Sequence, residues 1–280
     1  MTRRLFGTLC GLVLLVNFGR TVFAPLVEPL QTAFGVGPAT IGFVTTLVWV
    51  VSALPRIPVG YVLTRVPRHH VVLVAGGLLS VAAAFTASAT SVWTLQLGAL
   101  AIGIASGGYF VAAIPLIGEL RPERVGRSIG IHGTAAQIAA VIAAPVAVAA
   151  VTALDWRAAF WALAATAAVT TILLAGTARA IEGQIGTGPD RDFSAVLTHW
   201  RVVAVGLIMI AVAGFVWQGV FNFYVSYLID AKSIPAAEAG GYLTIVFAAG
   251  VPAFWLSGQL VDRFAPVPYI LTMLGVYTTA

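Results

Sequence analysis

Long apolar runs are the feature that most constrains the fold of this chain. Eight of them approach the ~20 residues that a helix needs to cross a bilayer, at about residues 5–28, 38–62, 71–89, 92–118, 128–152, 157–178, 202–229 and 239–259. The 280 residues are 60% hydrophobic and 9% charged, whereas an average soluble domain is about 25% charged. No soluble fold of this size buries so much apolar sequence, and the runs therefore predict an all-α polytopic membrane protein.

A ninth apolar run begins near Pro268 and reaches Ala280, which is about half a crossing. A helix that ended there would leave backbone groups unsatisfied in lipid, so we expect a chain truncated at its C-terminus. At the other end, Arg3 and Arg4 before an apolar run are typical of a secretory signal. The run continues past Arg20 without a small-residue cleavage site, and we therefore expect a retained first helix.

Basic residues set the predicted orientation. Of the fifteen lysines and arginines, two lie within spans, two lie in one set of alternate connections and eleven in the other. The eleven are Arg3, Arg4, Arg65, Arg68, Arg121, Arg124, Arg127, Arg179, Arg191, Arg201 and Arg263. This bias predicts that they and the N-terminus face the cytoplasm, in a cell membrane. The same distribution argues against nucleic acid as a partner of a chain whose net charge is +5.

One long connection divides the chain. It carries Gly183, Gly186, Gly188 and Pro189 among charged residues, a composition typical of a linker. We predict a six-helix transmembrane bundle over residues 1–180, a cytoplasmic linker over 181–200 and a partial second bundle over 201–280, which holds the seventh, the eighth and part of the ninth helix.

A polar stripe interrupts the first apolar run and recurs in the second half. By their spacing, five residues share one helical face: Asn17, Arg20, Thr21, Ala24 and Glu28. An offset of 198 residues aligns them without a gap with Phe215, Gln218, Gly219, Asn222 and Ser226. A polar helix face that is repeated with changed chemistry predicts a transporter.

The arginine in this stripe needs a reason to be there. On insertion scales an arginine near the centre of a membrane helix costs about 2.5–3.5 kcal/mol. Two interpretations of Arg20 stay open: it contacts a substrate or coupling ion, or it is a structural charge that pairs with Glu28 or reaches outward to the interface.

Two other spans offer polar residues. The second has Thr45, Trp49, Ser52 and Arg56 on one stripe, although Arg56 lies about a turn before Gly60 and can instead extend to the cytoplasmic surface. The fifth has His132 and the deeper Gln137, of which Gln137 is the better candidate for a substrate contact, while His132 is either a titrating group or a satisfied histidine.

Glycines in the fourth and fifth spans predict close helix packing. Gly103 and Gly107 have the small-residue spacing of membrane helix interfaces, and Gly130 and Gly133 are similar. The segment at 103–108 lacks the preceding strand and the spacing of a dinucleotide-binding loop, so we expect no cofactor. No cluster of histidine, cysteine or acidic residues has metal-ligand spacing, and we expect no metal and no catalytic residue.

Two cytoplasmic turns carry related motifs. The segment Gly60-Tyr-Val-Leu-Thr-Arg-Val-Pro-Arg follows the second span, and Gly258-Gln-Leu-Val-Asp-Arg stands 198 residues later. Both resemble the loop signature Gly-x-x-x-Asp-Arg-x-Gly-Arg-Arg of the major facilitator superfamily. The loop from Glu119 to Arg127 and the segment Asp155-Trp-Arg-Ala-Ala-Phe160 are also similar to segments of that family.

The resemblance implies two six-helix bundles that rock around a central site. It implies a substrate wall formed by Arg20, Asn17, Gln218, Asn222, Gln137, Trp49 and Arg56. It also implies a gate at the cytoplasmic turns, formed by Gly60, Arg65, Arg68, Gly258, Asp262 and Arg263. In the first turn Thr64 replaces the acid and Pro67 replaces the second glycine. We therefore expect a weaker latch there than in the second turn, where a latch is a set of contacts that forms in one conformational state and breaks in the other. The alternative for Arg65 and Arg68 is that they have no role in the gate and only reflect the excess of basic residues in cytoplasmic loops.

The expected function is secondary transport of a small solute. Two intramembrane arginines without a mid-span carboxylate favour an organic or inorganic anion. A drug or metabolite exporter of the same family is the alternative, although Ala99 stands where such exporters have an arginine. A receptor or scaffold that does not transport is a further class, and we do not expect an enzyme. The expected partners are a small-molecule substrate, a coupling ion and the bilayer, and the expected state is a monomer.

Overall fold

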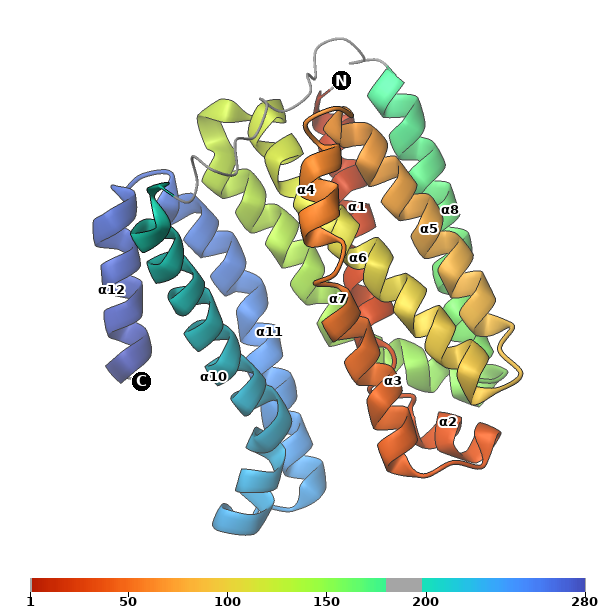
Figure 1. Ribbon diagram of the computed structural model, residues 1–280. Helices are drawn as coiled ribbons and strands as arrows, with labels where there is room; N and C mark the ends of the chain where they lie inside the picture. Colours follow the sequence, from red (N-terminus) through yellow and green to blue (C-terminus); the bar gives the residue numbers. More distant parts are fainter. Residues whose placement is uncertain (1, 180–197, 280) are drawn as a thin grey trace. The chain divides into compact units, whose positions relative to one another are not determined.

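The computed structural model describes residues 2–179 and 198–279, and for Thr2 and several residues between 217 and 279 it describes the backbone only. Every regular element in this part of the chain is helical (Figure 1), as the apolar runs predict. Within residues 2–179 and 198–279, six segments are long and apolar enough to cross a membrane, namely Pro38–Val62, Arg68–Ala87, Val92–Leu120, Pro122–Ala153, Arg157–Arg179 and Thr244–Val261.

The helices follow the predicted order, with shifted bounds. They are α1 (Thr2–Thr21), α2 (Val27–Phe34), α3 (Pro38–Val51), α4 (Arg56–Val62), α5 (Arg68–Ala87), α6 (Val92–Leu120), a 3-10 turn (Pro122–Arg124), α7 (Val125–Ala153), α8 (Arg157–Arg179), α10 (Trp200–Lys232), α11 (Ala236–Val261) and α12 (Pro266–Thr279). The predicted linker over 181–200 lies outside the described residues except for its last three positions.

The first two predicted spans are broken, and our expectation of continuous helices there was wrong. Pro25 has no amide proton to donate to the carbonyl of Thr21, and turns of three residues replace the helix between Thr21 and Val27. The second break has the same cause, because Pro55 cannot donate to Val51. The hydroxyl of Ser52 donates to the carbonyl oxygen of Trp49 at 2.7 Å beside this break.

The first break changes which residues share a face. Thr21 ends α1, and its hydroxyl donates to the carbonyl oxygen of Asn17 at 2.9 Å, a contact that bends helices. Asn17 and Arg20 stay on α1, whereas Ala24 lies in the turn and Glu28 in the first turn of α2. The predicted five-residue stripe is therefore reduced to its first three members.

The N-terminal helices pack as a bundle. Helix α5 packs against α6 and α8, α1 lies against α6, α7 and α8, and α3 lies on α6. The core between them consists mostly of buried leucine, valine and alanine. Aromatic rings close its α2 end, where the ring centroids of Phe23 and Phe160 are 5.0 Å apart and those of Phe34 and Trp156 are 5.7 Å apart.

Two glycines of α6 allow the backbone at the C-terminal end of α3 to approach closely. A Cβ atom on Gly103 would lie 2.7 Å from the carbonyl oxygen of Val48, and one on Gly107 would collide with the carbonyl oxygen of Ser52. These positions have the close contacts that the small-residue spacing predicts. The seam between α3 and α6 therefore depends on the absence of side chains at two positions of α6.

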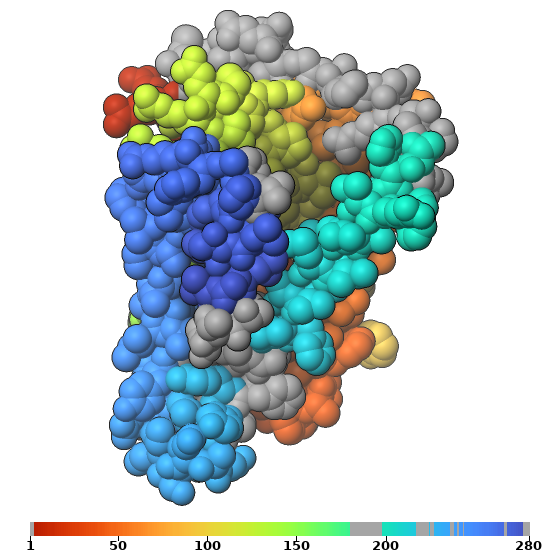
Figure 2. All heavy atoms as spheres, turned by 90° about the vertical axis from the view of Figure 1, so that its left-hand side faces the viewer, coloured from red at the N-terminus to blue at the C-terminus, as the bar shows by residue number. Residues whose placement is uncertain are grey.

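By their contacts the residues fall into two units, one of Met1–Gly188 with Gly250–Ala280 and one of Pro189–Ala249. In the second unit, large apolar side chains of α10 reach the surface along Trp200–Val216 (Figure 2, teal). Such exposure is ordinary for a helix that faces lipid. The predicted division at 180, 181–200 and 201 stays a prediction.

Adding a methyl group at Gly107 should destabilise the bundle. We expect Gly107→Ala to cost about 1–3 kcal/mol, because the new Cβ forces α3 away from α6. The matched control is Gly77→Ala in α5, where the added Cβ has no atom within 4 Å. Alanine in an open helical position should be neutral or slightly stabilising. Thermal unfolding in detergent compares the two variants, and equal melting temperatures would contradict the seam described above.

Candidate functional site

Arg20 lies against aromatic rings of two other helices. It occupies the last turn of α1, and its Cζ lies 3.8 Å from the ring centroid of Trp49 in α3. The ring centroid of Phe110 in α6 is 5.5 Å from the same atom. A cation over an aromatic face is attracted by the ring quadrupole, by about 0.5–2 kcal/mol depending on solvation. The structure thus brings together two of the predicted wall residues, Arg20 and Trp49.

No acidic partner accompanies this cation within the described part of the chain. The ion pairs found there join Arg68 to Glu119 and Arg157 to Asp155. Glu28, the partner that the sequence left open for Arg20, is exposed in α2. The Nε atom of Arg20 is buried and has no hydrogen-bond partner among the described residues. Arg20 is therefore held by aromatic faces and by the negative end of the α1 dipole rather than by a carboxylate.

A second cation is near the first. Arg56 begins α4 and is exposed, as expected for a side chain that can extend to a membrane surface. Its charge repels that of Arg20. Among the described residues no ion pair places a carboxylate between these two like charges, so they form a region of positive potential.

Asn17 and Gln137 lie where α1 meets α7. The Nδ2 atom of Asn17 donates to the carbonyl oxygen of Ala136 at 2.6 Å. Gln137, the next residue, is 7% exposed, and a Cβ atom on Gly250 of α11 would lie 3.0 Å from its Nε2. Asn17 therefore has a structural hydrogen bond in addition to its predicted role at the wall.

Two predicted wall residues lie outside the side chains that the structure describes. Gln218 and Asn222 belong to α10, and only their backbone is described. Their predicted role therefore remains an expectation from the repeat.

A buried tyrosine and histidine connect three helices, and no sequence pattern predicted this pair. The hydroxyl of Tyr109 donates to the carbonyl oxygen of Leu9 at 2.8 Å and lies 2.9 Å from Nε2 of His132. The hydroxyl proton goes to Leu9, because a carbonyl oxygen only accepts, so His132 must donate from Nε2. His132 is 2% exposed, and the satisfied-histidine interpretation fits it. A tyrosine within an apolar run carries no signal that distinguishes this role.

The turn between α4 and α5, the first of the two predicted cytoplasmic turns, is partly buried. Gly60 is buried in α4, and Arg65 is exposed with its Cζ 5.4 Å from the ring centroid of Tyr61. Arg68 is buried and forms an ion pair with Glu119 at the end of α6. Arg68 is thus more than an exposed charge that follows the orientation bias, since it ties α5 to α6.

The turn after α11, the second of the two predicted cytoplasmic turns, contacts the beginning of α7. Asp262 follows the last residue of α11, and its two carboxylate oxygens accept from the backbone amides of Gly126 at 2.7 Å and Arg127 at 2.8 Å. These amides are in the first turn of α7, where helices leave donors unsatisfied and favour negative charge. Gly258 packs on Gly130, and a Cβ atom on either would lie 2.7 Å from the other's Cα. Arg263 is exposed.

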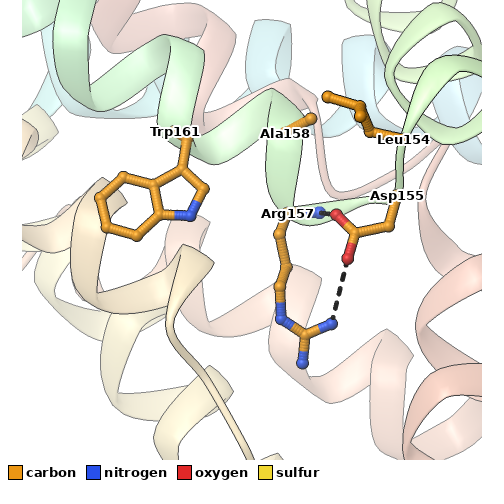
Figure 3. A pocket seen from close by; sticks show the side chains of 5 residues that line it. All are labelled: Leu154, Asp155, Arg157, Ala158 and Trp161. Atoms are coloured by element: carbon orange, nitrogen blue, oxygen red, sulfur yellow. Dashed lines mark hydrogen bonds and ion pairs between the residues drawn. The ribbon is translucent and has the colours of Figure 1, made fainter.

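An open depression lies where α7 is joined to α8 (Figure 3). Leu154, Asp155, Arg157, Ala158 and Trp161 line it. The backbone amide of Arg157 donates to the carboxylate Oδ1 of Asp155 at 2.8 Å. The side-chain Nη2 of the same arginine donates to the carbonyl oxygen of Ala89 at 3.0 Å. The arginine thus clamps this connection to the one between α5 and α6. In the described residues no group of three metal-ligating side chains occurs.

Comparisons with known proteins agree on one family. The family model described as Major Facilitator Superfamily matches residues 9–280. The purine ribonucleoside efflux pump NepI of Salmonella paratyphi B is 23% identical over 230 residues, which are 82% of this chain and 57% of that protein. The chain therefore spans little more than half the length of the curated relatives that it matches.

Solved structures share the fold at low identity. The proton:xylose symporter XylE bound to 6-bromo-6-deoxy-D-glucose has a TM-score of 0.67 and 18% identity, over 94% of this chain and 70% of that one. The transporter FucP in the outward conformation has a TM-score of 0.63 and 19% identity, over 93% of this chain and 72% of that one. Both agree with the predicted all-α membrane fold.

Removing the charge of Asp262 should loosen the first turn of α7. In Asp262→Asn one carboxylate oxygen becomes a donor, which cannot accept from an amide, and the favourable charge at the helix terminus is lost. We expect the amides of Gly126 and Arg127 to exchange hydrogen for deuterium about tenfold faster, if the two contacts together stabilise this turn by about 1.4 kcal/mol. Asp230→Asn, at an exposed position of α10, is the control. Unchanged exchange in Asp262→Asn would show that the carboxylate does not hold this helix end.

Proposed function

This chain belongs to the Major Facilitator Superfamily, and from that premise we propose that it is a secondary transporter of a small solute. Alternating access between two helical bundles is the proposed mechanism. The family match over residues 9–280 is the observation that carries this proposal. The family consists of transporters and the relatives are named as pumps or symporters, so the enzyme class is set aside.

We propose a location in the cell membrane with the N-terminus in the cytoplasm. The distribution of basic residues supports this, with eleven in one set of connections and two in the other. A monomer is the proposed state, and a coupling ion is a proposed partner beside the substrate and the bilayer.

The proposed substrate is a small organic or inorganic anion. Its support is the environment of Arg20, whose guanidinium rests on aromatic rings near a second cation and, among the described residues, without a carboxylate. An anion that enters this region would neutralise a charge that the described side chains leave uncompensated. Asn17, Trp49, Gln137 and Arg56 are the proposed neighbours, with Gln218 and Asn222 from the second half.

A metabolite exporter is the second candidate function. The matched relatives are named as purine ribonucleoside efflux pumps, and nucleosides are uncharged at neutral pH. A nucleoside would use the aromatic faces of Trp49 and Phe110 rather than the charge of Arg20. The two candidates therefore differ in whether Arg20 is required.

The cytoplasmic turns are the proposed gate. The contact of Asp262 with the first turn of α7 supports this role, because it joins the two halves of the sequence through hydrogen bonds that a rocking motion can break and remake. Gly258 allows the close approach, and Arg263 is the proposed partner of the same loop. Gly60, Arg65 and Arg68 are proposed for the first turn.

Transport by the natural full-length protein in liposomes tests the function. We expect saturable uptake of a radiolabelled organic anion, and its loss in Arg20→Gln, because the neutral side chain no longer pairs with the substrate charge. A fall of tenfold or more in kcat/KM would correspond to about 1.4 kcal/mol of lost stabilisation.

Three other outcomes discriminate between the classes. Uptake of adenosine but of no anion, unchanged in Arg20→Gln, would favour the nucleoside exporter. Ligand binding without uptake of any solute would favour the receptor class. Equal uptake by both variants would show that Arg20 is structural. Arg124→Gln, at an exposed cytoplasmic position, is the control for the loss of one positive charge.

A further inference from the structure

The contact between Arg20 and Trp49 uses only one part of the guanidinium group. A guanidinium is planar, it stacks through its face, and its five N–H groups point outward in its plane. A Cζ atom 3.8 Å from the indole centroid is at the spacing of a guanidinium that stacks through its face. Stacking therefore leaves the N–H edge available for hydrogen bonds, so cation–π contact and anion binding do not compete.

The edge of Arg20 includes a donor that none of the described residues accepts. Nε is buried and has no hydrogen-bond partner among the described residues. A buried donor without an acceptor costs about 1–3 kcal/mol, a cost that a ligand bound at this edge removes. Nε–H and one Nη–H are parallel and match the two oxygens of a carboxylate or a phosphate.

Two helices fix the orientation of this edge. Trp49 comes from α3 and Phe110 from α6, and the two aromatic side chains restrict the rotation of a long flexible side chain that extends from α1. Holding a ligand-binding group in its bound geometry lowers the entropy that binding must overcome. The seam of α6 glycines against the end of α3 keeps both rings at a fixed separation.

We propose that Trp49 is a positioning residue that holds the guanidinium of Arg20 face-on, so that its Nε edge receives an oxyanion through two oxygens. The inference rests on the proposed role of Arg20 in substrate binding and narrows the substrate class. Carboxylates and phosphates fit this edge, whereas a monatomic anion such as chloride cannot form two parallel hydrogen bonds. Lysine at position 20 would keep the charge and lose both the stacking and the edge.

Ligand binding to the natural full-length protein in detergent tests the proposal. The probes are benzoate, inorganic phosphate and chloride, and the dissociation constants come from thermal shift. In the wild type we expect benzoate or phosphate to bind at least tenfold more tightly than chloride. Arg20→Lys should lose this preference. Trp49→Leu should weaken oxyanion binding about tenfold, and Trp49→Phe, which keeps an aromatic face, should restore most of it.

A spectroscopic measurement separates positioning from folding. Binding of phosphate, which is not itself fluorescent, should change the tryptophan emission of the wild type, and the change should be absent in Trp49→Phe. Trp93→Leu, at a residue of α6 that is 78% exposed, is the control and should bind as the wild type does. The emission test remains decisive if Trp49→Leu does not fold.

The outcomes that overturn the proposal are distinct. Wild-type affinity in Trp49→Leu would show that Trp49 does not position Arg20, while the proposed function would stand. Chloride affinity equal to that of the oxyanions would exclude the two-oxygen contact. Failure of the wild type to bind any anion would overturn the proposed substrate class and this inference with it.

Discussion

Inside a bilayer a polar group has no water to bond, so its partner must come from the protein. This constraint explains why polar side chains of the bundle form hydrogen bonds between helices. Asn17 bonds the backbone of α7, Tyr109 joins Leu9 of α1 to His132 of α7, and Ser80 of α5 donates to the carbonyl oxygen of Ala164 in α8 at 2.8 Å. Each bond both satisfies a buried or part-buried group and fixes one helix against another. Arg20 departs from the pattern, because aromatic rings hold it and its Nε has no partner among the described residues.

The sequence predicted the helical order well, because hydropathy and length are local properties. The starts of α6 at Val92 and of α8 at Arg157 agree with the predicted spans. The two breaks were not predicted, because the apolar runs continue through Pro25 and Pro55 and hydropathy alone does not register a missing amide proton. At the candidate site, Arg20 and Trp49 were predicted separately. The contact of Arg20 with Trp49, and its contact with Phe110, depend on how three helices pack, and no local sequence pattern encodes that packing.

The polar residues of the two related turns differ in their hydrogen-bond partners: Thr64 bonds within its own segment, whereas Asp262 bonds another helix. The hydroxyl of Thr64 donates to the carbonyl oxygen of Tyr61 at 2.8 Å, within its own segment. The carboxylate of Asp262 instead bonds two amides of another helix. An ionised carboxylate is an acceptor only and must find donors elsewhere, whereas a hydroxyl can donate to the nearest carbonyl. This difference supports the expectation, still a prediction, that the two latches are unequal in strength.

The break in the second span has a consequence for biosynthesis. Helix α3 has 14 residues and α4 has 7, so their lengths are about 21 Å and 10 Å, and neither crosses a hydrocarbon core of about 30 Å alone. The insertion machinery must therefore receive Pro38–Val62 as one segment. The carbonyl of Ser52 finds its place against Gly107 only once α6, which is synthesised later, is in the membrane. The break itself is set locally by Pro55, whereas its close fit against Gly107 is a product of assembly, reached after the chain has already crossed the bilayer several times.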